Sequence, residues 1–137
     1  MNLKTVTLRH RSSRRLLRWR MGLAGAAVVF VTALAHATQT LTTASQVITI
    51  DVRCEEGELG CTDVHFSGVE RKTGRTLSLR GEEVYRLCAD GETPCQFLHY
   101  RFEQGDLVYL LGDNGLLHVK QGEQVLIEEQ GEWDYGQ

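Results

Sequence analysis

Four cysteines at two equal spacings are the residues of this sequence most suited to chemistry. Six residues separate Cys54 from Cys61, and six separate Cys88 from Cys95. Such thiols could hold zinc, exchange with other thiols, or form disulfides. Structural zinc sites usually space paired cysteines by about two to four residues, and redox enzymes favour the shorter Cys-x-x-Cys. The spacing therefore favours structural disulfides, and we expect neither a metal nor a cofactor.

Three pairings of the four cysteines are possible, and the sequence alone does not choose among them. We favour Cys54 with Cys61 and Cys88 with Cys95, because each intervening segment contains glycine and polar residues that can turn the chain back. Closing such a short loop stabilises the fold by about 2.5 kcal/mol through the entropy lost by the unfolded chain. An even number of cysteines also fits folding in an oxidising compartment.

The other candidate catalytic or metal-binding residues have simpler explanations. His65, His99 and His118 each stand on the polar face of an expected strand. These strands are not neighbours in a simple meander, so the imidazoles should face solvent rather than share a metal ion. The acidic run 55–58 lacks the ordered ligand pattern of a calcium loop. A small meander also rarely forms a deep cleft, so we expect no enzymatic activity.

The first 37 residues have the three parts of a secretory signal peptide. Seven of the fifteen basic residues lie in the first twenty positions, an apolar segment covers residues 21–35, and Ala35-His36-Ala37 is a small-x-small cleavage site. We expect cleavage after Ala37 and export to the periplasm or the extracellular space. The alternative is an uncleaved membrane anchor over residues 21–37, although an anchor normally needs about 20 apolar residues.

Charge restricts the partners of residues 38–137. This part carries eight basic and eighteen acidic residues, a net charge of -10 with neutral histidines. Phosphate backbones and anionic lipid surfaces repel such a domain, so we expect no nucleic-acid partner. Membrane contact would occur only through residues 21–37 if they are not removed. This charge either attracts a cationic protein or only keeps the domain in solution.

Alternation of apolar and polar residues predicts an all-β domain over residues 46–137, preceded by a flexible lead-in over residues 38–45. Seven or eight short strands joined by glycine-containing turns indicate an antiparallel meander that closes as a barrel or folds as a sandwich. The expected strands cover residues 46–53, 63–67, 76–80, 83–87, 96–103, 107–111, 117–120 and 125–127.

The expected strand 96–103 alternates most strongly and should lie at the centre of the sheet. The side chains expected in the core are Leu98, Tyr100 and Phe102. His99 and Arg101 then share the opposite face, which is the only distinctive polar face nearby. If the domain binds a partner, we expect His99 and Arg101 to lie on the binding surface.

These observations describe an exported, disulfide-stapled β protein that acts as a non-catalytic binding or interaction module of the periplasm or cell envelope. In length, export and strand pattern the chain resembles the small periplasmic β-barrel inhibitors of bacterial lysozyme defence. The resemblance implies an inhibitor of a basic enzyme such as lysozyme, and no inhibitory loop of that family matches the chain residue by residue. The remaining alternatives are a structural envelope protein held by an N-terminal anchor and a small hydrolase.

Overall fold

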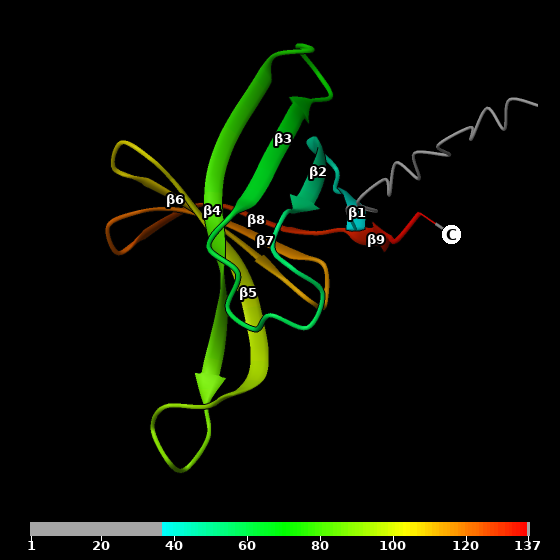
Figure 1. The fold of residues 1–137 in the computed structure, drawn as a ribbon. Helices are drawn as coiled ribbons and strands as arrows, with labels where there is room; N and C mark the ends of the chain where they lie inside the picture. The colour runs from blue at the N-terminus through cyan, green and yellow to red at the C-terminus, as the bar shows by residue number, and fades with distance from the viewer. Residues whose placement is uncertain (1–36, 137) are drawn as a thin grey trace, which may run out of the picture. The chain divides into compact units, whose positions relative to one another are not determined.

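The computed structural model describes residues 37–136, which form one nine-stranded antiparallel sheet (Figure 1). Apart from Ala37, the expected signal peptide or anchor lies outside the described residues. The strands are β1 (Ala37–Thr42), β2 (Gln46–Val52), β3 (Val64–Glu70), β4 (Thr76–Leu87), β5 (Pro94–Gln104), β6 (Leu107–Gly112), β7 (Leu116–Gln121), β8 (Gln124–Gln130) and β9 (Glu132–Asp134). Within residues 37–136 there is no helix of the length and hydrophobicity needed to span a membrane.

The sheet is rolled into a nearly closed barrel, which confirms the predicted all-β meander. Each strand from β1 to β7 pairs with the next, and β9 returns to pair with β1. Gly131 joins β8 to β9, and its N–H donates to the carbonyl of Gly115 at 2.9 Å. The Ser45 hydroxyl, in the β1–β2 turn, donates to Glu129 of β8 at 2.8 Å. These bonds bring the last strands back to the first.

The core fills the barrel interior with one alternating face of each main strand. The largest fully buried side chains are Leu41, Ile48, Ile50, Val64, Phe66, Phe102, Leu111 and Leu117. Phe66 lies at the centre of this core, with its ring centroid 5.2 Å from that of Phe102 and 5.6 Å from that of Tyr109. Tilted rings at these separations attract one another in addition to burying apolar area.

Both local disulfides are confirmed. Cys54 pairs with Cys61 in the β2–β3 loop, at a Cα–Cα distance of 5.7 Å, and Cys88 pairs with Cys95 at 5.2 Å. Cys61 is completely buried and belongs to the core cluster. The second disulfide closes the tip of the long β4–β5 hairpin, which projects from the barrel (Figure 1).

The lead-in expected over residues 38–45 is instead strand β1 and the turn that follows it. β1 pairs with β2 along its whole length, and Leu41 is fully buried between its neighbours. Threonine and glutamine dominate this segment, so the sequence has little apolar alternation to indicate a strand. Leu41 alone supplies the buried apolar anchor.

Two expected strands, 76–80 and 83–87, form the single strand β4. Gly81 lies between them and does not end the strand. A Cβ atom at this position would lie 2.1 Å from the carbonyl oxygen of Arg101 and 2.4 Å from the Phe102 ring. Glycine here therefore permits close approach of β4 to β5, a role that glycine often has inside sheets.

Removing the two disulfides should have unequal effects although both close a sequence separation of 7. Each closure contributes about 2.5 kcal/mol through chain entropy. Because Cys61 is also buried, Cys54→Ala/Cys61→Ala should lose about 1–2 kcal/mol more than Cys88→Ala/Cys95→Ala. Urea denaturation measures both free energies of unfolding. An equal or larger loss for the second pair would contradict the assignment of Cys61 to the core.

Candidate binding surfaces

The two residues predicted as a binding face, His99 and Arg101, both lie on the outer face of β5. His99 lines an open depression of about 220 Å³ that Leu110 and His118 also line. The Arg101 guanidinium pairs with Glu82 at 3.5 Å and with Glu103. Arg101 is therefore largely neutralised by its own neighbours, which weakens its attraction for an outside partner.

Leu98 does not belong to the core, so that part of the prediction is wrong. The pairing of β4 with β5 shifts its register here, leaving Leu98 without an opposite residue. Such a β-bulge reverses the alternation of the strand. Leu98 lines the same outer depression as His99, and Phe97 packs against the core in its place. Tyr100 and Phe102 are buried as predicted.

The three histidines do not meet. His99 on β5 and His118 on β7 line one depression, but β6 separates their strands. His118 contacts Glu128 at 3.1 Å, and His65 contacts Asp63 at 2.9 Å on another part of the sheet. Within residues 37–136 no group of three or more His, Cys, Asp or Glu side chains could hold a metal ion.

A continuous row of five aromatic rings connects the β4–β5 hairpin to the C-terminal tail. We call this set the aromatic row. It consists of Tyr85, Phe97, Tyr100, Trp133 and Tyr135, and its successive ring centroids are 5.6, 4.9, 6.2 and 6.2 Å apart. Burial decreases toward the tail, from 7% exposure at Tyr100 to 57% at Tyr135. The row therefore presents a supported aromatic surface to solvent at its C-terminal end.

An open depression of about 730 Å³ lies beside this end of the row. The residues that matter chemically in its lining are Gln39, Tyr100, Asp134 and Tyr135. The Gln39 side-chain amide donates to the Tyr100 hydroxyl, and the Gly136 N–H donates to Asp134 Oδ1 at 2.9 Å. Burial, followed by the charge of Glu83, raises the pKa of Tyr100 to about 12, so its phenol stays protonated. Among residues 37–136, the side chains that line it include a carboxylate and no basic group.

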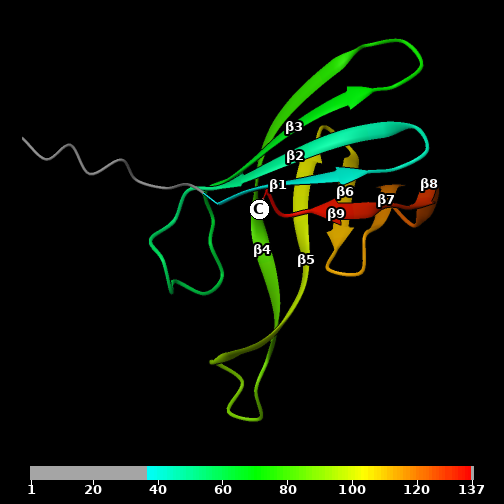
Figure 2. The same cartoon turned by 90° about the vertical axis from the view of Figure 1, so that its right-hand side faces the viewer.

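Acidic side chains gather on the loops at one end of the barrel, which we call the acidic end. In an antiparallel meander the β2–β3, β4–β5 and β6–β7 connections emerge at the same end (Figure 2). The exposed acids on these three connections are Glu55, Glu56, Glu58, Asp90, Glu92 and Asp113. The β3–β4 turn at the opposite end carries the basic residues Arg71, Lys72 and Arg75. The charge of the domain is thus polarised along the barrel.

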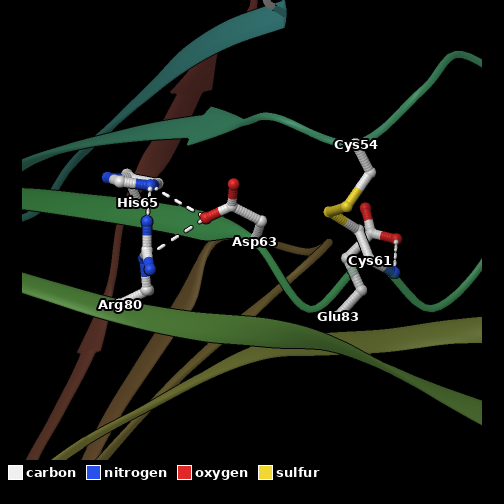
Figure 3. The surroundings of a disulfide bond; sticks show 6 residues. All are labelled: Cys54, Cys61, Asp63, His65, Arg80 and Glu83. Carbon is white, nitrogen blue, oxygen red and sulfur yellow. Dashed lines mark hydrogen bonds and ion pairs between the residues drawn. A yellow bond between two sulfur atoms is a disulfide. The ribbon is translucent and has the colours of Figure 1, made fainter.

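The Cys54–Cys61 loop is fixed to the barrel at the acidic end (Figure 3). The Glu83 N–H donates to the Cys61 carbonyl at 2.8 Å, and the Cys61 N–H donates to the Glu83 carboxylate at 3.2 Å. The loop is therefore closed by a disulfide and also bonded to β4. Its carboxylates are presented on an ordered segment, which lowers the entropy cost of binding a partner.

A small hydrolase would need a nucleophile beside a base, and the outer face of β3 and β4 carries a polar network that includes His65 (Figure 3). Asp63 contacts His65 at 2.9 Å and Arg80 at 3.3 Å, beside a shallow depression of about 470 Å³ that Ser67 and Ser78 also line. A Ser–His nucleophile requires a hydrogen bond between the two side chains. Among the described residues no serine donates to His65, whose Nε2 instead contacts Asp63 and Arg80.

Sequence reasoning missed most of the aromatic row and the depression beside it. Trp133 of β9 is held in the row by its indole N–H, which donates to the Gly112 carbonyl at 2.9 Å. No alternation pattern could place Tyr135 and Tyr100 in the lining of one depression, because the C-terminal tail reaches β1 only through the pairing of β9 with β1. No known protein family, curated protein or solved structure matches the chain.

The position of His99 predicts a pH effect. Partial burial, followed by the charges of Arg101 and Lys120, lowers the pKa of His99 below the ordinary value of 6.5. A lowered native pKa means that the unfolded chain binds more protons in this range. The contribution of neutral His99 to stability should therefore be present above pH ~6.5 and be lost as the pH falls toward the native pKa.

Ring-proton titration by NMR measures this pKa directly. Urea denaturation measures the free energy of unfolding at pH 7 and at pH 5. Its decrease between the two pH values should be smaller for His99→Gln than for the unmodified protein, and His65→Gln serves as the matched control. Titration of His99 at or above its ordinary pKa would contradict the burial seen in the structure.

Proposed function

We propose that the protein is a non-catalytic binding module that takes a cationic protein partner at its acidic end. One observation carries this proposal: exposed carboxylates and the aromatic row occupy the same end of a rigid barrel. Oppositely charged surfaces steer association, and aromatic rings supply contact area and attract cationic groups. The two disulfides indicate an oxidising compartment outside the cytoplasm, and we place the protein in the periplasm or the extracellular space.

Several carboxylates elsewhere on the surface are paired with arginines, so they attract a cationic partner less than the unpaired acids of the acidic end do. On the outer face of the sheet, Arg53 pairs with Asp51 at 2.7 Å, and Arg80 pairs with Asp63 at 3.3 Å. The first pair neutralises a carboxylate of β2, and the second neutralises Asp63 in the β2–β3 connection, immediately before β3. In the part of the chain that the structure describes, Glu55, Glu56 and Glu58 form no ion pair. The negative potential available to a partner is therefore strongest around the loops of the acidic end.

Inhibition of a basic enzyme such as lysozyme is the sharpest form of the proposal. It combines the polarised charge with the resemblance in overall build to periplasmic lysozyme inhibitors. A structural envelope protein is the alternative if residues 21–37 remain as an anchor. Intact-mass analysis separates the two possibilities, because a mature mass that begins at Thr38 excludes the anchor.

Mixing the purified protein with hen-type lysozyme at low and high salt tests the proposal. We expect binding that weakens with salt and an association rate about tenfold lower for Glu56→Gln/Glu58→Gln. The matched control is Asp106→Asn/Glu123→Gln, which removes the same charge from turns at the opposite end. Absence of both inhibition and salt-sensitive binding would exclude lysozyme as the partner. An equal effect of the two double variants would exclude the acidic end as the binding surface.

A further inference from the structure

The depression between β1 and the C-terminal tail has the chemistry of a pocket for a single cationic side chain. Its lining combines aromatic faces, an amide and a carboxylate, and none of the described residues that line it is basic. We propose that this depression receives an arginine side chain of the partner. The inference rests on the proposed function, because it names the group of the cationic partner that the acidic end recognises.

The aromatic part of the pocket suits a planar cation. Tyr135 is 57% exposed, and its ring is stacked on Trp133 at 6.2 Å with an interplanar angle of 27°. Trp133 in turn packs against the core and is fixed by its hydrogen bond to Gly112. Tyr135 is thereby supported on one side. A guanidinium group can stack on such a ring through both cation–π attraction and planar contact, whereas an ammonium offers only a point charge.

The carboxylate of Asp134 supplies the charge that a guanidinium needs. Asp134 lies on β9 opposite Thr40, and Oδ1 accepts the Gly136 N–H at 2.9 Å. This bond orients the carboxylate. Within residues 37–136 Asp134 forms no ion pair, and Oδ2 accepts no hydrogen bond. A carboxylate held in this way can accept two parallel N–H donors from one arginine.

The neighbouring polar groups are also suitable acceptors. The side-chain nitrogen of Gln39 donates to the Tyr100 hydroxyl, which leaves the amide oxygen of Gln39 as an acceptor at the pocket wall. Arginine carries five N–H donors and no acceptor, so a wall of oxygen atoms satisfies it. The volume of about 730 Å³ lies within the range of small-molecule binding sites, which exceeds what one arginine side chain needs.

Titration of the ¹⁵N-labelled protein with acetyl-Gly-Arg-Gly-amide tests this inference. The control peptide replaces arginine with citrulline, which keeps the shape and removes the charge. We expect the arginine peptide to shift the Trp133 indole and Gly136 amide signals, with an affinity about tenfold higher than that of the citrulline peptide. Asp134→Asn should weaken arginine binding about tenfold, and Tyr135→Leu about fivefold. The charge control Glu123→Gln should change it less than twofold.

Equal binding of the arginine and citrulline peptides, or unchanged affinity in Asp134→Asn, would contradict the arginine pocket. Stronger binding of a lysine peptide, or of the neutral disaccharide N,N′-diacetylchitobiose, would also contradict it if the Trp133 indole and Gly136 amide signals shift. The proposed function would survive any of them if Glu56→Gln/Glu58→Gln still slows association with the basic protein. Loss of both effects would reject the pocket and the cationic partner together.

Discussion

Return of the C-terminal strand to the first strand is the constraint on which the rest of the structure depends. β9 pairs with β1 through Leu41 and Trp133, which covers the core where the sheet would otherwise be open. The crossing occurs at Gly131, where a Cβ atom would lie 2.6 Å from the carbonyl oxygen of Thr42. Only glycine fits so close an approach without displacing backbone. The same crossing brings Tyr135 to the wall formed by β1, so closure of the barrel also builds the pocket.

The two disulfides have equal loops but different structural roles. Cys54–Cys61 joins a loop to the core, since Cys61 is buried and bonded to Glu83 on β4. Cys88–Cys95 braces a hairpin that extends beyond the barrel and that a core of this size does not cover. That hairpin holds Tyr85 and Phe97, the first two rings of the aromatic row. The Cys54–Cys61 disulfide therefore stabilises the core, and the Cys88–Cys95 disulfide stabilises the projecting hairpin.

Local pattern predicted most strands and both disulfides, because alternation and short loops depend on neighbouring residues. Local pattern failed where pairing between distant segments decides which side chains are buried and which segments form strands. The bulge at Leu98 results from the register of β5 against β4, and it exchanges the roles of Leu98 and Phe97. β1 was missed because its pairing, rather than its composition, makes it a strand. The aromatic row depends on the bulge, which turns Phe97 inward, and on the pairing of β9 with β1, which places Trp133. The sequence alone therefore could not predict this site.

The sequence predicted a binding surface at His99 and Arg101, whereas the structure favours the acidic end. Ion pairing explains the difference. The net charge of -10 over residues 38–137 does not by itself locate a binding surface. Arg101 lies between two glutamates, Arg53 pairs with Asp51 of β2, and Arg80 pairs with Asp63 immediately before β3. Because most of the cations are on the strands or the opposite turn, the uncompensated acids remain on the loops. A cationic partner should therefore approach along the barrel axis toward the aromatic row, where desolvated contact can add to long-range attraction.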